Sequence, residues 1–204
     1  MKPPISVMLF AKAPVPGTVK TRLIPVLGAE AAAQLAERLA EQTLEAALAS
    51  QVGPVSLWGS PDAAHPFFRK MQARYGITLE SQEGADVGVR MEHALNRALR
   101  SHAAAILTGT DLWHPSPALF TDAARALTTG ATAVLAPSVD GGYVLIGLTR
   151  PIPGLFREMA WGTERVCRET VQRLEARDCP FVMLPLHRDL DTPEDYAAWR
   201  STNE

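Results

Sequence analysis

Short apolar runs alternate along the chain with longer stretches in which apolar residues recur at helical spacing. The runs predict strands at residues 5–11, 52–59, 77–82, 103–108, 131–136, 143–148 and 181–186. The longer stretches predict helices at residues 28–50, 61–75, 88–101, 115–129, 163–177 and 193–200. This alternation is typical of an α/β protein, and it predicts a three-layer sandwich built around a mostly parallel, mixed sheet.

The first predicted strand, at residues 5–11, is a continuous apolar run, as expected for a strand that is buried on both faces. It is too short to cross a membrane, and a Pro-Val-Pro-Gly turn follows it at residues 14–17. The sequence therefore predicts neither a membrane span nor a signal peptide, and we expect a cytoplasmic protein.

The bulk composition narrows the function classes. A length of 204 residues fits one domain, so residues 1–204 are predicted to form a single domain. Apolar residues make up 47% of the chain, which is enough for a real core, and the net charge of −2 argues against nucleic acid as a partner. Cys167 and Cys179 stand in no CxxC or CxH pattern, so neither a zinc site nor a disulfide framework is indicated.

The segment after the first predicted strand has the composition of a phosphate-binding loop. Between residues 12 and 23 it carries three cations, two prolines, a glycine and two hydroxyl side chains. Lysine offers a phosphate a point charge, arginine a bidentate fork, and glycine lets backbone N–H groups approach an oxyanion. The spacing matches neither the Walker A loop nor the GxGxxG turn, and the alternative is a solvated basic loop. The candidate phosphate-binding residues are Lys12, Gly17, Lys20, Thr21 and Arg22.

Two acidic segments are candidates for holding a divalent cation. Asp111 follows the fourth predicted strand directly, where its carboxylate can hold Mg²⁺ or Mn²⁺ against a diphosphate. Asp189 and Asp191, two residues apart in an extended segment, point the same way, so either can complete this metal site. Alternatively, Asp111 caps a turn, and Asp191 with Thr192 caps the last helix.

Two other segments are candidates for contacts with a substrate or acceptor. Asp140 precedes Gly141 and Gly142, and this sequence makes either a tight turn with room for a ligand or an ordinary hairpin turn. Trp161 precedes a glycine and a possible helix cap, and it is either a stacking platform or a core or lid aromatic.

The glycine-spaced loop at residues 82–91 leads into a predicted helix and can contact the base or ribose of a nucleotide, with Asp86 and Arg90 as its candidates. Ligands of open α/β sheets bind beyond the carboxyl ends of the strands. Because the candidate segments follow the first, third, fourth and fifth strands, we expect them to form one site at this edge of the sheet.

Five motifs occur together in this chain. They are FAKAPVPGTVKTRL at residues 10–23, GTDL at 109–112, SVDGGYVLIGL at 138–148, WGT at 161–163 and DLDTPEDY at 189–196. In this order they resemble bacterial glycosyltransferase-like proteins of the GT-A, nucleotide-diphospho-sugar transferase superfamily. One branch is known as arsenosugar-biosynthesis glycosyltransferase-like. The resemblance covers essentially the full chain, and the first and third motifs are the most specific to this family.

The resemblance implies a Rossmann-like mixed sheet of GT-A type with a nucleotide bound over its N-terminal half. It also implies that Asp111 holds a divalent ion, that Asp191 assists it with Asp189 as its neighbour, and that the cations of the first loop contact phosphates. The chain departs from the expected pattern at Trp113, where we expect a small residue or proline. An aromatic residue there is expected to reshape the acceptor pocket.

Three functions compete at this point. In glycosyl transfer, a nucleotide-diphosphate sugar binds the first loop and the metal, Lys20 helps to neutralise the leaving diphosphate, and Asp140 is the candidate general base toward a small-molecule acceptor. In nucleotidyl transfer, a phosphorylated small molecule attacks the α-phosphorus of an NTP and pyrophosphate leaves. The third possibility is a nucleotide-binding module without turnover, which predicts binding that does not depend on metal.

Overall fold

The computed structural model describes residues 4–203 and contains one seven-stranded sheet. Its strands are β1 (Ser6–Lys12), β2 (Val55–Ser60), β3 (Thr78–Ser81), β4 (Ala105–Gly109), β5 (Ala133–Pro137), β6 (Tyr143–Leu148) and β7 (Phe181–Met183). Their order across the sheet is β3-β2-β1-β4-β6-β5-β7. Among these described strands β6 alone runs antiparallel to its neighbours, so the predicted mixed, mostly parallel sheet is confirmed.

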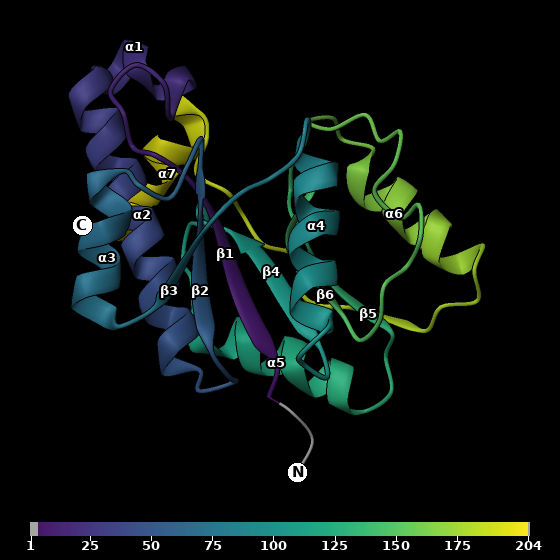
Figure 1. The fold of residues 1–204 in the computed structure, drawn as a ribbon. Coiled ribbons are helices and arrows are strands. Elements are labelled where there is room, and N and C mark those ends of the chain that lie inside the picture. The colour runs from purple at the N-terminus through teal and green to yellow at the C-terminus, as the bar shows by residue number, and fades with distance from the viewer. Residues whose placement is uncertain (1–3, 204) are drawn as a thin grey trace.

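Helices cover both faces of the sheet, as predicted (Figure 1). One face carries α2 (Ala29–Ala49), α3 (Pro66–Tyr75) and α5 (Pro117–Thr128), and the other carries α4 (Val87–Leu99) and α6 (Val166–Glu175). A 3-10 turn, η1 (Thr21–Leu23), the short α1 (Ile24–Leu27) and α7 (Pro193–Asn203) pack at one end of α2. Within residues 4–203, no helix is long and apolar enough to cross a membrane.

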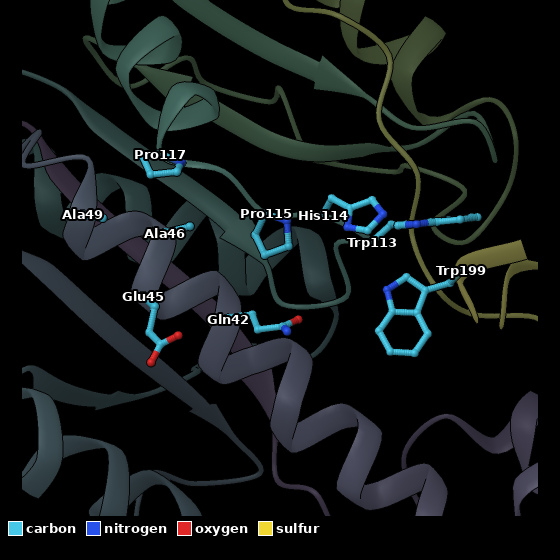
Figure 2. Close-up of a pocket in the computed structure, with 9 residues that line it drawn as sticks. All are labelled: Gln42, Glu45, Ala46, Ala49, Trp113, His114, Pro115, Pro117 and Trp199. Carbon is cyan, nitrogen blue, oxygen red and sulfur yellow. The ribbon is translucent and has the colours of Figure 1, made fainter. Parts of the chain in front are cut away.

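A surface cleft of about 400 Å³ lies between α2, the start of α5 and α7 (Figure 2). Gln42 and Glu45 of α2 form one side, and Trp113 and His114 of the β4–α5 connection face them together with Trp199 of α7. This cleft shares no lining residue with the cavities at the carboxyl ends of the strands that are described below.

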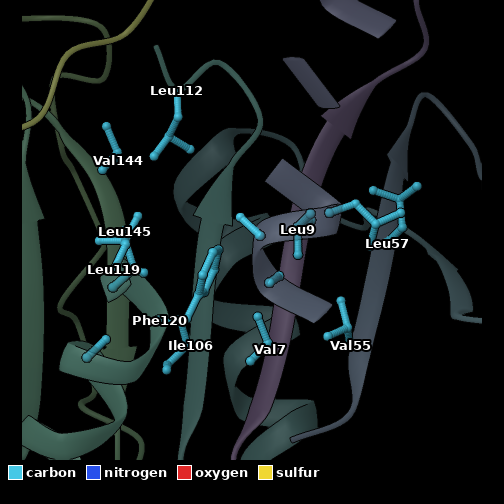
Figure 3. Close-up of a cluster of buried hydrophobic side chains, with 14 of the residues drawn as sticks. Val7, Leu9, Val55, Leu57, Ile106, Leu112, Leu119, Phe120, Val144 and Leu145 are labelled. Atoms are coloured by element: carbon cyan, nitrogen blue, oxygen red, sulfur yellow. The ribbon is translucent and has the colours of Figure 1, made fainter. Parts of the chain in front are cut away.

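Strand side chains divide alternately between two cores, because successive residues of a strand point to opposite faces. In β1, Val7 and Leu9 pack beneath α2, α3 and α5, whereas Met8 packs beneath α4. Figure 3 shows the first of these cores, in which Phe120 of α5 lies close to Ile106 of β4. The continuous burial of β1 follows from helices on both of its faces, as its apolar run predicted.

The largest side chain that α5 buries in this core is Phe120, which is 0% exposed. We expect Phe120→Ala to lower the free energy of unfolding by about 3–5 kcal/mol, because it removes apolar contacts and leaves a cavity. Equilibrium urea denaturation measures the change. Thr121→Ala, at the exposed neighbouring position, is the matched control and should change stability by less than about 0.5 kcal/mol. A Phe120→Ala protein as stable as the Thr121→Ala protein would contradict this packing.

The start of α3 differs from the prediction for local chemical reasons. The helix predicted at 61–75 begins only at Pro66, because His65 accepts a hydrogen bond from Phe67 N through its ring and Pro66 occupies the first turn. Asp62 belongs to a separate turn, in which its carboxylate accepts from Ala64 N. The sequence analysis also did not predict η1 and α1, which lie between the first loop and the long helix α2.

The strand order places a switch point between β1 and β4. From β1 the chain moves outward through β2 to β3, and it then returns to β4 on the opposite side of β1. The connections that leave β1 and β4 therefore diverge, and a crevice opens beyond their carboxyl ends, where open α/β sheets bind ligands. The segments that begin at Ala13 and Thr110 border this crevice.

Candidate functional site

The loop after β1 is a series of tight turns tied to the end of β2. Ala13 N donates to Ser60 O at 2.7 Å, Val15 N to Ala13 O at 2.8 Å, and Thr18 N to Val15 O at 3.0 Å. Gly17 has φ +83, a backbone conformation that a residue with a Cβ adopts only at a cost. These turns bring Lys12 Nζ within 2.7 Å of Thr18 O, so the cation lies against the loop's own backbone.

Lys20, at the end of this loop, is the centre of an ion-pair cluster. Its backbone is in the left-handed region (φ 47, ψ 40), and its side chain is only 3% exposed. Nζ donates to Asp191 Oδ1 and to Leu190 O, each at 2.8 Å, and forms an ion pair with Asp111. Burial lowers the pKa of Lys20, whereas the negative charges of Asp111 and Asp191 raise it. The two carboxylates together outweigh burial, so the pKa of Lys20 lies above its usual value.

An extended segment before α7 brings the late aspartates to Asp111. Leu112 and Asp189 form an antiparallel bridge, in which Trp113 N donates to Arg188 O at 3.0 Å and Leu190 N to Asp111 O at 2.9 Å. The same segment also pairs with the chain after β5, where His187 N donates to Pro137 O at 2.8 Å. One stretch of backbone therefore joins the loops after β4 and β5 beside Lys20.

Asp189 lies among the other carboxylates of this region. Burial raises the pKa of Asp189, and the neighbouring charges of Asp140, Asp111 and Asp191 raise it further, to about 7. Lys20 opposes this rise. The site thus collects negative charge from three separate segments, which carry Asp111, Asp140, and Asp189 with Asp191.

The turn after β5 holds Asp140 in place. Asp140 Oδ1 accepts hydrogen bonds from Ser138 Oγ and, at 2.9 Å, from Gly142 N. Gly141 has φ +88, and a Cβ at this position would overlap the Glu164 carbonyl oxygen. Because Cys167 N also donates to Gly141 O at 2.9 Å, the turn packs tightly against the start of α6. Only glycine fits at residue 141.

Three cavities meet around these carboxylates. The first, of about 270 Å³, is polar and is lined by Lys12, Lys20, Asp111 and Asp191 together with Phe10. Seven further residues, from the loop, α2, α3 and the end of β4, complete its lining: Pro14, Thr18, Val19, Ala36, Ala40, Phe67 and Thr110. The size and charges of this cavity suit phosphate groups.

The second cavity, of about 240 Å³, is mainly apolar. Its surface includes the side chains of Phe10, Met91, Tyr143 and Trp161, and Asp140 contributes a carboxylate. The third cavity, of about 190 Å³, lies between Arg22, Arg188 and the aspartates at positions 140, 189, 191 and 195. Shared lining residues join all three: Phe10 lines the first and second, Asp140 the second and third, and Asp191 the first and third.

The structure brings most of the predicted site residues together but separates some of them. Lys12 and Lys20 share the polar cavity with Asp111, whereas Arg22 lines the third cavity, and Thr21 is exposed at the start of η1. Asp86 caps α4 by accepting from Val89 N at 2.9 Å, and Arg90 donates to Gly84 O at 3.0 Å. These last two residues lie outside the linings of the three cavities.

Trp161 lines the apolar cavity and is also packed against protein. Its ring stacks on Phe156 at a centroid distance of 6.4 Å, and a Cβ on Gly88 would come within 2.6 Å of it. Trp113, which was expected to reshape the acceptor pocket, is 8% exposed and lines the separate cleft of Figure 2 instead. Its indole lies beneath the guanidinium of Arg188, 5.5 Å from the ring centroid.

The sequence analysis missed three contributors. Phe10 and Met91 belong to a strand and a helix whose periodicity indicated only core positions, yet both line the apolar cavity. Arg188 lines the third cavity, but the sequence analysis considered only the aspartates of its segment. Its positive charge in a loop, next to Asp189, could have indicated it.

The carboxylates suit an open metal site rather than a closed protein cage. In the part of the chain that the structure describes, no group of three or more His, Cys, Asp or Glu side chains is arranged to hold a metal ion. Asp111 and Asp191, however, direct oxygens at one common cation, the ammonium of Lys20, and their side chains are 51% and 45% exposed. Two carboxylates completed by water and phosphate oxygens are a usual donor set for Mg²⁺.

The fold is that of nucleotide-diphospho-sugar transferases and nucleotidyltransferases. The chain belongs to the bacterial family described as "Uncharacterized protein conserved in bacteria (DUF2064)", whose model matches residues 43–163. No curated protein matches the sequence significantly. A solved structure of a "putative nucleotide-diphospho-sugar transferase" from Desulfovibrio desulfuricans G20 is similar, with 30% identity and a TM-score of 0.89 over 98% of this chain and 87% of that one.

More distant structures share the fold alone. The inositol-1-phosphate CTP transferase of T. maritima has 12% identity and a TM-score of 0.62, with 100% of this chain and 96% of that chain covered. Glucosyl-3-phosphoglycerate synthase of Mycobacterium tuberculosis, solved with Mn²⁺ and UDP, has 14% identity and a TM-score of 0.60, with 96% and 75% covered. One is named for nucleotidyl transfer and the other for glycosyl transfer, so this fold serves both reactions.

Proposed function

We propose that this protein is a metal-dependent transferase that takes a nucleotide-diphosphate sugar as donor and passes the sugar to a small-molecule acceptor. Residues 1–204 then act as one GT-A-type domain. The motifs at residues 10–23 and 138–148 support a place in the arsenosugar-biosynthesis glycosyltransferase-like branch. The cytoplasmic location expected from the sequence stays a prediction.

The charge balance of the polar cavity carries this proposal. The two lysines that line it, Lys12 and Lys20, are offset by two aspartates, Asp111 and Asp191. A diphosphate brings negative charge into this cavity, and Lys20 is already neutralised by its two carboxylate partners. Binding a diphosphate there therefore requires a further cation, and exposed carboxylate oxygens select Mg²⁺ or Mn²⁺. The Mn²⁺ and UDP found in glucosyl-3-phosphoglycerate synthase support the same choice.

Each group of the chain has a place in this reaction. A divalent ion on Asp111 and Asp191 supplies charge neutralisation for the departing diphosphate. Lys12 donates from its Nζ to the phosphate oxygens, since its position beside Thr18 O leaves it on the cavity surface. Phe10 and Trp161 provide an apolar surface for the sugar or the acceptor and keep water away from it.

Asp140 is the proposed general base. Its carboxylate lines both the apolar cavity and the third cavity, so it faces the space between donor and acceptor. Hydrogen bonds from Ser138 and Gly142 hold one oxygen in place. In an inverting reaction, Asp140 takes the proton of the acceptor hydroxyl as that oxygen attacks the anomeric carbon and the bond to the diphosphate breaks.

Nucleotidyl transfer is the second candidate. Lys12 and Lys20 line the same cavity as Asp111, so both can approach the charged equatorial oxygens of an α-phosphorus during in-line attack. A phosphorylated small molecule would then be the acceptor, and pyrophosphate would leave.

Product analysis separates these functions. The protein is incubated with Mg²⁺ or Mn²⁺ and with panels of nucleotide sugars, NTPs and phosphorylated or hydroxylated acceptors, and the products are separated by chromatography. We expect a nucleoside diphosphate to be released from a nucleotide sugar, and EDTA to stop the release. Pyrophosphate release from an NTP would establish nucleotidyl transfer instead. Nucleotide binding that is independent of metal and yields no product would contradict both enzyme functions.

A further inference from the structure

Lys20 has no proton left for a phosphate in this structure. An ammonium group carries three N–H donors. Nζ lies 2.8 Å from both Leu190 O and Asp191 Oδ1 and is also paired with Asp111 Oδ1. These three acceptors account for all three donors. Lys20 can therefore bind the phosphate of a nucleotide only after giving up one of its present partners.

Asp111 and Asp191 are also the residues assigned above to the divalent cation. A divalent ion cannot share them with the ammonium unchanged, because two positive charges a few ångströms apart repel strongly in a partly buried site. The exposures indicate how an exchange can occur. The carboxylates are about half exposed, whereas the Lys20 side chain is only 3% exposed. A cation from solvent thus reaches both carboxylates without crossing the lysine.

We propose that a divalent cation and the Lys20 ammonium exchange places on Asp111 and Asp191, and that the released ammonium then binds the diphosphate. The inference rests on the proposed function, because it assumes that a metal binds at these carboxylates. Lys20 is a positioning residue before the exchange, when it holds the two carboxylates together. It becomes a phosphate ligand afterwards, so metal entry controls when the buried cation becomes available to the donor.

Lys12 provides a control for this exchange within the same protein. It lines the same cavity, but the hydrogen bond found for its Nζ is to Thr18 O, and it forms no ion pair with any residue in the described range 4–203. Each of the substitutions Lys12→Met and Lys20→Met therefore removes one positive charge from the same cavity. Only Lys20→Met also removes a group that competes with the metal for the two carboxylates.

The first test measures Mn²⁺ binding without nucleotide, by electron paramagnetic resonance of free Mn²⁺. Because the competitor is gone, Lys20→Met should bind Mn²⁺ at least about tenfold more tightly, the equivalent of one charge-assisted hydrogen bond. Lys12→Met should tighten binding by less than about threefold, as expected for a charge that touches neither carboxylate. Lys20→Arg, which keeps a cation in place, should stay close to the natural protein. Equal or weaker Mn²⁺ binding by Lys20→Met overturns the exchange but leaves the proposed metal site intact.

The second test needs no substitution and so does not depend on the folding of a variant. In protein labelled at lysine side chains, the Lys20 signal should shift on titration with Mg²⁺ as the ammonium leaves its carboxylates, whereas the Lys12 signal should not. Inorganic pyrophosphate added afterwards should shift both signals. A Lys20 signal that ignores Mg²⁺, in protein that demonstrably binds it, overturns the exchange. Failure of the natural protein to bind Mg²⁺ or Mn²⁺ at all overturns the metal site of the proposed function as well.

Discussion

Asp111→Asn should lower metal-dependent turnover about a hundredfold or more, which corresponds to about 2.7 kcal/mol of transition-state stabilisation. The amide keeps the size of the side chain but carries no charge for a divalent ion, so Asp191 is left to hold the ion alone. Lys20 loses one of its two carboxylate partners at the same time. Initial rates at a series of Mn²⁺ concentrations measure the effect, which should appear as weaker metal activation together with a lower limiting rate.

A matched substitution separates loss of the metal from loss of structure. Asp122 pairs with Arg125 on the surface of α5 and lines none of the cavities described above, so Asp122→Asn should leave turnover unchanged. In the absence of metal, the Asp111→Asn protein should bind pyrophosphate at least as well as the natural protein does, because one negative charge has left the polar cavity. Metal activation that is the same in both variants would show that Asp111 is not a metal ligand.

Gly141→Ala should destabilise the protein by about 2–4 kcal/mol and also reduce activity. A left-handed backbone with a Cβ costs about 1–2 kcal/mol, and overpacking adds a similar amount. The added methyl group would overlap the Glu164 carbonyl oxygen, so the turn and the start of α6 must move apart. Asp140 belongs to that turn and would move with it. Urea denaturation and steady-state kinetics of one preparation measure the two effects.

Gly76 supplies the control for Gly141. It ends α3 with φ +67, and a Cβ there meets no heavy atom within 4 Å. Gly76→Ala therefore carries the backbone strain without the collision, and we expect a loss of about 1 kcal/mol with normal activity. If the two substitutions destabilise equally, the close approach of Gly141 to Glu164 is not what requires glycine there.

Local sequence patterns predicted the sheet and the general location of the site, because both follow from residues that are neighbours in the sequence. The apolar run of β1 indicated a strand buried on both faces, and the rule that ligands bind beyond carboxyl ends then placed Lys12 and Asp111 in one crevice. The distribution of charges within the crevice was not predictable in this way. Arg22 follows Lys20 by two residues, yet η1 turns it toward a different cavity.

Long-range contacts explain the features of the site that the sequence patterns did not predict. The bonds between Lys20 and Asp191 join residues 171 positions apart, and no periodicity links them. Their meeting depends on the antiparallel bridge of Leu112 with Asp189, which is visible only once the sheet is assembled. Trp113 shows the same limit: its place after Asp111 indicated the acceptor pocket, but the bridge turns its side chain toward α2.

The segment at residues 187–191 has a consequence for the order in which the protein forms. Translation delivers Lys12, Lys20, Asp111 and Asp140 long before this segment emerges, and until then the buried ammonium has only part of its final set of partners. Contacts of such sequence separation form late because a long loop must close first. A nascent chain can thus assemble most of its sheet before residues 187–191 emerge and complete the set of partners of Lys20.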